Sequence, residues 1–271
     1  MSKPKIGKDI VITLVDIETK PLIGYFWSLF DEQGGLPMLK EDWCILSWSA
    51  KRFDPEGKKK YPVIYRDQRN AKDLLNDKKI LEELREILDK TDYLVGHNVA
   101  RFDAKKINAR FLAHDIPQPS PYKLVDTLKI AKKHFALTSN KLEYLCKFLN
   151  CKIRKYKSKE FPGMNLWTEC MAGNKAAWNE MEIYNKDDVL SLEEVLRKLL
   201  PWDNTINFNI FNPTAFKCTC GSTECKENGH SYEKAGIYKR YKCKKCHRPY
   251  KDPTNLLNKS AGGKGTKGMK K

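Results

Sequence analysis

Residues 9–18 constrain the fold of this chain more than any other segment. The apolar positions from Ile10 to Val15 are mostly β-branched, and the run ends in Asp16-Ile-Glu18. This pattern predicts a buried strand with acidic residues at its carboxyl end. Because side chains two residues apart on a strand point to the same side, Asp16 and Glu18 can both reach one metal ion. Taken alone, such a pair is more often a solvated strand end.

The segments that follow place several strands before the first helix. Residues 22–30, 43–53 and 62–66 are aromatic or β-rich and predict strands, whereas the apolar spacing at 80–88 predicts a helix. The pattern then predicts a strand at 93–95, a helix at 100–113, a strand at 124–125, helices near 127–135 and 141–149, and a long helix from about 175 to 200. Strands first and strand–helix alternation afterwards predict an α/β domain with a mixed sheet flanked by helices.

Aromatic side chains are frequent in the early strands. We expect most of them to lie in the core and one or two to stack bases. They are Tyr25, Phe26, Trp27, Trp43 and Trp48.

Basic charge is concentrated toward the end of the chain. Residues 214–271 hold 15 Lys+Arg against 4 Asp+Glu, a net charge of +11 out of +17 for the whole sequence. A basic segment favours a polyanionic partner, nucleic acid or an acidic membrane surface, and a solubilising tail is the alternative. No apolar run approaches the length that spans a bilayer, and the first nine residues lack a signal-peptide pattern. We therefore expect no membrane partner and a reducing, cytoplasmic location.

Five of the nine cysteines fall within residues 218–246. Without a secretory signal, this cluster predicts metal binding rather than disulfides. Cys218-x-Cys220 and Cys243-x-x-Cys246 would bind one structural Zn²⁺ through four thiolates, as in a zinc ribbon. The first pair departs from the usual two-residue spacing, which leaves Cys225 as an alternative ligand. We expect the basic residues around the second pair to bind nucleic acid; a structural or protein-docking ribbon is the alternative.

Composition divides the chain into four parts. We expect an α/β domain at 1–203, an Asn/Pro-rich linker at 204–213, a small zinc-binding domain at 214–253 and a disordered basic tail at 254–271.

Two further acidic motifs lie at the ends of predicted elements. In Gly96-His-Asn98-x-x-x-Phe-Asp103 a strand ends, Asn98 is a candidate helix cap, and Asp103 follows within the first turn or so. In Tyr184-Asn-Lys-Asp-Asp188 the i, i+4 spacing puts Tyr184 and Asp188 on one face of the long helix. That face is apolar, and a buried carboxylate there favours a metal or another cation as its partner. Asp126 is expected to cap a helix or to support the site.

Together, these motifs resemble the DEDD superfamily of 3′–5′ exonucleases, the proofreading-exonuclease or RNase H-like group. Asp16 and Glu18 match its first motif, Asp103 its second and Asp188 its third. The Tyr184-x-x-x-Asp188 form is that of the DEDDy branch, as in the exonuclease domains of family B polymerases. The resemblance covers about residues 10–202 and implies an RNase H-like fold. The order of an exonuclease-like domain and a small basic ribbon also resembles proteins encoded by bacteriophages.

The resemblance implies a catalytic site. Its four carboxylates suit hard cations, so we expect two Mg²⁺ or Mn²⁺ ions that clamp the attacking and leaving oxygens of a phosphodiester. In this family the tyrosine hydroxyl orients the attacking water, a role that falls on Tyr184, and Glu18 would share it. We expect Thr19, Asn98, Lys155 and Lys157 to contact the substrate.

The resulting hypothesis is a metal-dependent 3′–5′ exonuclease that acts on single-stranded ends, DNA rather than RNA. It would act alone or beside a DNA polymerase or another replication protein. The alternatives are a 3′–5′ exoribonuclease with the same fold and a non-catalytic nucleic-acid-binding protein on an exonuclease scaffold.

Overall fold

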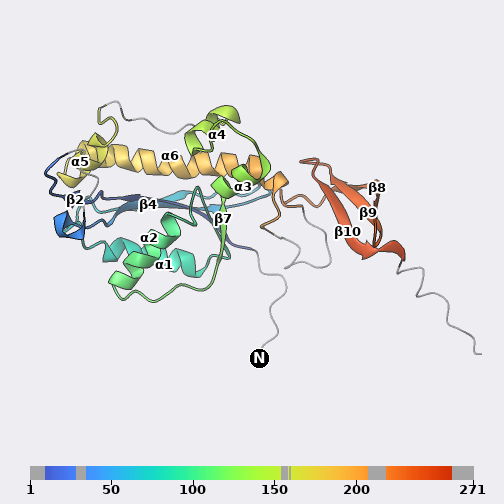
Figure 1. Ribbon diagram of the computed structural model, residues 1–271, viewed down its shortest axis with the longest axis horizontal. Coiled ribbons are helices and arrows are strands. Elements are labelled where there is room, and N and C mark those ends of the chain that lie inside the picture. Colours follow the sequence, from blue (N-terminus) through green and yellow to red (C-terminus); the bar gives the residue numbers. More distant parts are fainter. Residues whose placement is uncertain (1–9, 29–34, 154–157, 159, 207–217, 258–271) are drawn as a thin grey trace, which may run out of the picture. The chain divides into compact units, whose positions relative to one another are not determined.

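The computed structural model describes residues 10–28, 35–153, 158, 160–206 and 218–257. The chain forms two compact units, one spanning Asp9–Leu199 and the other including the chain from Leu200 onward (Figure 1). Lys155 and Lys157 lie outside the described residues.

The larger unit is built on a five-stranded mixed sheet. The strand order is β5-β4-β1-β6-β7. Its members are β1 (Ile12–Thr19), β4 (Ile45–Phe53), β5 (Val63–Asp67), β6 (Tyr93–Gly96) and β7 (Lys123–Asp126). β1 pairs antiparallel with β4 and parallel with β6, and β6 pairs parallel with β7. The predicted α/β fold with a mixed sheet is therefore confirmed.

Helices cover both faces of this sheet. They are α1 (Lys78–Asp89), α2 (Asp103–Ala113), α3 (Thr127–His134), α4 (Leu142–Phe148), α5 (Asn165–Met171) and α6 (Lys175–Leu199). Figure 1 shows α1 and α2 on one face and α6 on the other. The long predicted helix is thus α6, which ends where Pro201 follows.

The central strand β1 explains how the acidic residues reach a single face. Val15 and Ile17 are buried in a cluster that includes residues of α1 and α2. Since side chains alternate along a strand, Asp16 and Glu18 face the opposite side, where α6 packs. The same alternation that buries the strand therefore presents its two carboxylates to α6.

A short two-stranded sheet lies outside the main one and corrects the expectation for the early aromatics. It pairs β2 (Ile23–Gly24) with β3 (Leu39–Glu41). Trp48 of β4 is fully buried, but the side chains of Tyr25, Phe26 and Trp27 are 68%, 62% and 93% exposed. The expectation that most of these aromatics are core was wrong for these three, because β2 does not join the main sheet.

The smaller unit holds a three-stranded antiparallel sheet. Its strands are β8 (Cys225–Glu233), β9 (Gly236–Cys243) and β10 (Pro249–Asn255), with β9 in the centre. β10 includes Thr254 and Asn255, two residues that composition assigned to a disordered tail. Among the described helices of either unit, none is long and apolar enough to cross a bilayer.

Candidate metal centres

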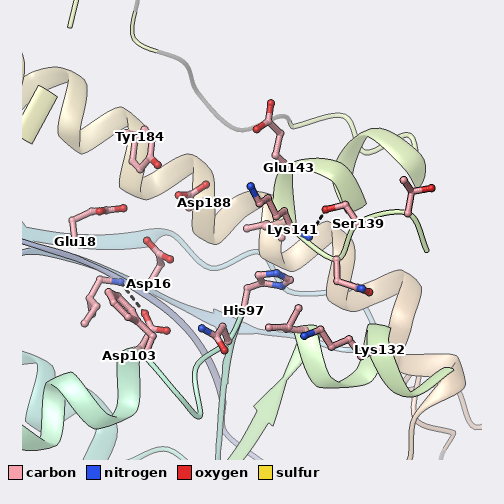
Figure 2. A pocket seen from close by; sticks show the side chains of 17 residues that line it. Asp16, Glu18, His97, Asp103, Lys132, Ser139, Lys141, Glu143, Tyr184 and Asp188 are labelled. Atoms are coloured by element: carbon pink, nitrogen blue, oxygen red, sulfur yellow. Dashed lines mark hydrogen bonds between the residues drawn. The ribbon is translucent and has the colours of Figure 1, made fainter. Parts of the chain in front are cut away.

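Five residues predicted from three motifs line one cavity in the larger unit. The cavity has a volume of about 740 Å³. Asp16 and Glu18 enter it from β1, Asp103 from the first turn of α2, and Tyr184 and Asp188 from α6 (Figure 2). The fold thus brings together side chains that are up to 172 residues apart in the sequence.

Three of the four carboxylates form a close group. Oxygen atoms of Asp16, Glu18 and Asp188 lie within 4.8 Å of one another. Carboxylates at this spacing repel one another unless a cation or a proton is shared between them. Oxygen ligands of this kind fit hard divalent cations, of which Mg²⁺ and Mn²⁺ are the common examples.

Asp16 is oriented by a buried amide. Asn185 Nδ2 donates hydrogen bonds to Asp16 Oδ2 at 2.6 Å and to the Asp16 carbonyl oxygen at 3.3 Å. Asn185 is fully buried, and Ser47 Oγ in turn donates to its Oδ1 at 3.5 Å. The sequence analysis missed Asn185. Its spacing of four residues from the apolar Met181 and Val189 was the available signal, because it puts an amide on the inward face of the helix.

Asp103 is almost completely buried beside this group. The Ile17 N–H donates to Asp103 Oδ1 at 3.3 Å and so links α2 to β1 between the two acids of the first motif. Burial raises the pKa of Asp103 to about 7 against the opposing effect of its backbone hydrogen bonds, and the negative charge of Asp126 adds to the increase. Without a cation, this carboxyl group is therefore held partly protonated at neutral pH.

The ring of Tyr184 is held by an aromatic contact. It packs edge-to-face against Trp167 of α5, with ring centroids 5.5 Å apart and planes at 80°. This contact limits the directions in which the Tyr184 hydroxyl can point within the cavity.

Asp126 supports the second motif from outside the cavity lining. Its side chain caps α3 by accepting hydrogen bonds from the N–H groups of Leu128 and Lys129. It also accepts from the N–H groups of Asn98 at 3.0 Å and Ala100 at 3.3 Å. The expectation of a capping and supporting role for Asp126 agrees with these contacts.

Asn98 lies in the cavity wall but does not cap α2. The residue before α2 is Phe102, and Asn98 has a positive φ of 70° in the turn that leads to it. The helix-cap expectation for Asn98 was wrong, because this turn adds residues between the strand and the helix. Its neighbour His97 also lines the cavity, with Nδ1 2.9 Å from Thr127 Oγ1.

The cavity also has a basic wall that the motifs did not reveal. Lys132 of α3 and Lys141, which precedes α4, both line it and are exposed (Figure 2). Exposed lysines on short helices carry no distinguishing sequence signal. Thr19, predicted as a substrate contact, is not among the described residues that line this cavity.

In the smaller unit four cysteines form a second group. Sulfur atoms of Cys218, Cys220, Cys243 and Cys246 lie within 4.8 Å of one another. The Cys218–Cys246 and Cys220–Cys243 sulfur pairs are 3.4 and 3.8 Å apart. Two thiolates bound tetrahedrally to one Zn²⁺ at about 2.3 Å lie about 3.8 Å apart, whereas disulfide sulfurs lie about 2.05 Å apart. These residues therefore fit a zinc site. Cys225 lies opposite Cys243 in the β8–β9 ladder but outside this group.

Of the four clustered cysteines, Cys243 has a lowered pKa, whereas burial raises the pKa of Cys220 to about 11 and also raises that of Cys246. Tyr250 Oη donates to Cys218 Sγ at 2.6 Å, and the Thr219 N–H donates to Tyr250 Oη at 3.1 Å. Burial opposes ionisation of Cys243, but backbone N–H groups of Cys246 and Lys245 lower the pKa of its thiol to about 7. Metal binding requires deprotonated thiols, so the backbone contacts of Cys243 assist it.

Comparisons with known proteins agree with the architecture of the larger unit. The family model of the RNase H superfamily matches residues 37–200. The fold is similar to that of the family B DNA polymerase from the hyperthermophilic archaeon Pyrobaculum calidifontis, with a TM-score of 0.50 and 16% identity. That match covers 72% of this chain and 25% of the polymerase chain, so the present chain spans about a quarter of the polymerase's length. No curated protein matches the sequence.

Proposed function

Because the chain belongs to the RNase H superfamily, we propose that it is a metal-dependent 3′–5′ exonuclease of the DEDDy type. One observation carries this proposal. Asp16, Glu18, Asp103 and Asp188 line a single cavity together with Tyr184, although three separate elements contribute them. Carboxylates this close repel one another, and a divalent cation shared among them would relieve that repulsion.

In this proposal the carboxylates hold two divalent cations, Mg²⁺ or Mn²⁺. Ions bound there would polarise the phosphodiester and promote ionisation of water. Asn185 keeps Asp16 turned toward the cavity through its 2.6 Å hydrogen bond. Tyr184, fixed by Trp167, orients the attacking water with its hydroxyl group, and Glu18 accepts a hydrogen bond from the same water. A tyrosine hydroxyl is a weak proton acceptor, so positioning of the water is the role proposed for Tyr184.

We propose single-stranded 3′ ends as the substrate, with DNA favoured over RNA. Lys132 and Lys141 give the cavity a basic wall for the phosphates of the strand. An exoribonuclease with the same fold is the alternative enzyme. A non-catalytic nucleic-acid-binding protein is less consistent with the complete set of acids and Tyr184.

The smaller unit is proposed as a zinc ribbon that binds nucleic acid. The four clustered cysteines would hold one structural Zn²⁺, and basic side chains are frequent on the adjoining strand β9. They are Lys239, Arg240 and Lys242. Contacts from such side chains to phosphate would be independent of sequence and sensitive to salt. The exonuclease domain would then span residues 1–203 and the ribbon 214–253.

The biological setting is proposed from the resemblance alone. A stand-alone exonuclease or the partner of a DNA polymerase, encoded by a bacteriophage and acting in the cytoplasm of a bacterium or an infected host, fits this domain order. The similarity to a polymerase concerns the fold and identifies no partner.

A time course on end-labelled strands tests the proposed activity. Single-stranded DNA and RNA labelled at the 5′ end would be incubated with Mg²⁺, Mn²⁺ or EDTA. We expect a ladder that shortens from the 3′ end with either metal and no cleavage in EDTA. Release of label as a mononucleotide in the first turnover would instead show attack from the 5′ end and contradict the proposal.

Substitution of the carboxylates tests the assignment of the site. Asp16→Ala and Asp188→Ala should each abolish metal-dependent cleavage, because each removes an oxygen ligand from the close group. Glu227→Ala, in the smaller unit, is the matched control and should cleave normally. Thermal unfolding should show that the variants remain folded. Undiminished cleavage by either cavity variant would refute the assignment.

A further inference from the structure

The β2–β3 segment exposes an unusual set of large apolar side chains. We call residues 22–28 and 35–41 the aromatic arm. Its exposed members, with their exposed fractions, are Leu22 (60%), Tyr25 (68%), Phe26 (62%), Trp27 (93%) and Leu36 (85%). Scattered apolar side chains on a surface need no explanation, but Leu22, Phe26 and Leu36 line one cavity together, and exposed apolar groups of this kind are typical of interaction sites.

The arm is an ordered structure rather than a frayed end of the sheet. Gly24 pairs with Leu39 in the β2–β3 ladder, and the Tyr25 N–H donates to the Met38 carbonyl oxygen at 2.9 Å. A Cβ atom at Gly24 would lie 2.9 Å from that same oxygen, so only glycine lets the two strands approach this closely. The backbone pairing of β2 with β3 therefore fixes the segment that carries the exposed aromatic rings.

The base of the arm is tied to the strands that carry the proposed catalytic site. Lys20, two residues after Glu18, is buried and forms an ion pair with Glu41 of β3 at 2.6 Å. The Lys20 N–H also donates to the carbonyl oxygen of Cys44, just before β4. The arm thus follows the acidic end of β1 directly in the chain.

The chemistry of the arm favours unpaired bases as its ligand. A cavity of about 340 Å³ lies between Leu22 and Phe26 on one side and Leu36 and Met38 on the other, and its lining is mainly apolar. Lys40 Nζ lies 5.9 Å from the centre of the Tyr25 ring, which places a cation beside an exposed aromatic face. Aromatic platforms with adjacent basic groups stack bases while the cation attracts the backbone.

We propose that the aromatic arm binds unpaired bases of the nucleic-acid strand whose end lies in the carboxylate cavity. This inference rests on the proposed function for the identity of the strand. A protein partner would also cover apolar rings. Three features favour nucleic acid over a protein partner. They are the Lys40 ammonium group beside the Tyr25 ring, the net charge of +17 and the position of the arm directly after the acidic end of β1.

The test measures binding without cleavage. A fluorescently labelled single-stranded oligothymidylate and an abasic strand of equal length would be titrated in EDTA, with anisotropy as the readout. Base–aromatic stacking of about 1–3 kcal/mol per base predicts that Trp27→Ala and Phe26→Ala each weaken oligothymidylate binding about tenfold. Abasic binding should not change. Leu112→Ala, which removes an 81% exposed side chain from α2, is the matched control and should have no effect.

Conservative variants separate stacking from plain apolar contact. Trp27→Phe should keep most of the affinity, whereas Trp27→Leu should bind as weakly as Trp27→Ala. Equal binding by Trp27→Leu and the unsubstituted protein would show that the ring does not stack a base and would overturn the proposal. So would unchanged oligothymidylate binding by both alanine variants.

A small substrate separates this inference from the proposed function. The p-nitrophenyl ester of thymidine 5′-monophosphate carries no further bases and cannot reach the arm. Its metal-dependent hydrolysis should be the same in Trp27→Ala and in the unsubstituted protein. If Trp27→Ala loses oligothymidylate binding and the unsubstituted protein hydrolyses neither substrate, the result supports base binding by the arm and contradicts the exonuclease. If the unsubstituted protein hydrolyses both substrates and Trp27→Ala binds oligothymidylate normally, the result supports the exonuclease and contradicts base binding by the arm.

Discussion

Asn185 shows how one buried amide can set the geometry of a carboxylate group. Its side chain contacts both the carboxylate and the backbone carbonyl of Asp16, so it fixes the side-chain direction relative to β1. Groups that hold metal ligands in this way contribute to metal affinity without touching the metal.

The Asn185→Ala variant should need a higher metal concentration. Loss of a supporting contact typically costs 10- to 100-fold in metal affinity or activity. We expect the Mn²⁺ concentration for half-maximal cleavage to rise by about that factor. Asn179→Ala, at an exposed position of the same helix, is the control. An unchanged Mn²⁺ dependence in Asn185→Ala would show that the amide has only a packing role.

The raised pKa of Asp103 predicts a pH-dependent stability of the metal-free protein. The folded state holds its proton up to about pH 7, whereas an unfolded aspartate releases it near pH 4. The folded state therefore binds more protons in this window, and its stability falls as pH rises through it. Asp103→Asn removes this effect, so the variant should gain stability relative to the unsubstituted protein between about pH 4 and pH 7. Urea unfolding in EDTA measures the difference, and parallel pH curves would contradict the prediction.

At the scale of elements, Asp126 joins three pieces of backbone. It ends β7, caps α3 and holds the turn that precedes α2. Asp126→Ala removes all of these contacts, and the loss of the cap alone costs about 1–2 kcal/mol. We expect lower stability in urea together with weaker substrate binding, because the turn carries Asn98. Asp126→Asn keeps acceptor oxygen and should recover most of the stability; if it is as unstable as alanine, charge rather than capping is responsible.

The helices and strands that were predicted well from the sequence have a regular repeat of apolar residues. The β-branched run of β1 and the apolar stripe of α6 were found because burial repeats along each element. The four carboxylates and Tyr184 were found because they lie at the ends or on the inward face of such elements. Asn185 was missed because its place on the inward face of the helix does not show which group it contacts, here Asp16. The exposure of Tyr25–Trp27 was missed because strand pattern does not reveal which sheet a strand joins.

At the scale of the whole molecule, the two units have different sources of stability. The larger unit has an apolar core, whereas we expect the smaller one to depend on its cysteine cluster. Small domains with few buried apolar residues commonly require a metal to fold. A substitution in the cysteine cluster should therefore destabilise the smaller unit and leave the larger unit folded.

Cys243→Ser in the full chain tests this separation. It should remove one equivalent of bound Zn²⁺ and unfold the smaller unit, while hydrolysis of the nucleotide ester continues. Binding to oligonucleotide should weaken and become less dependent on salt, since the basic strands lose their arrangement. Cys225→Ser, outside the group of four, is the control and should retain zinc. Loss of zinc only in Cys225→Ser would reassign the ligands.

The wide spacing of the cavity residues along the chain has a consequence for synthesis. The ribosome synthesises Asp16 and Glu18 long before Asp188, which follows Glu18 by 170 residues. At about 5–20 residues per second, the nascent chain waits roughly 10 to 30 seconds for α6. Throughout that interval the acids of β1 lack both Asn185 and Asp188. The polypeptide therefore completes its carboxylate group only when α6 is synthesised, after all five strands of the main sheet have been made.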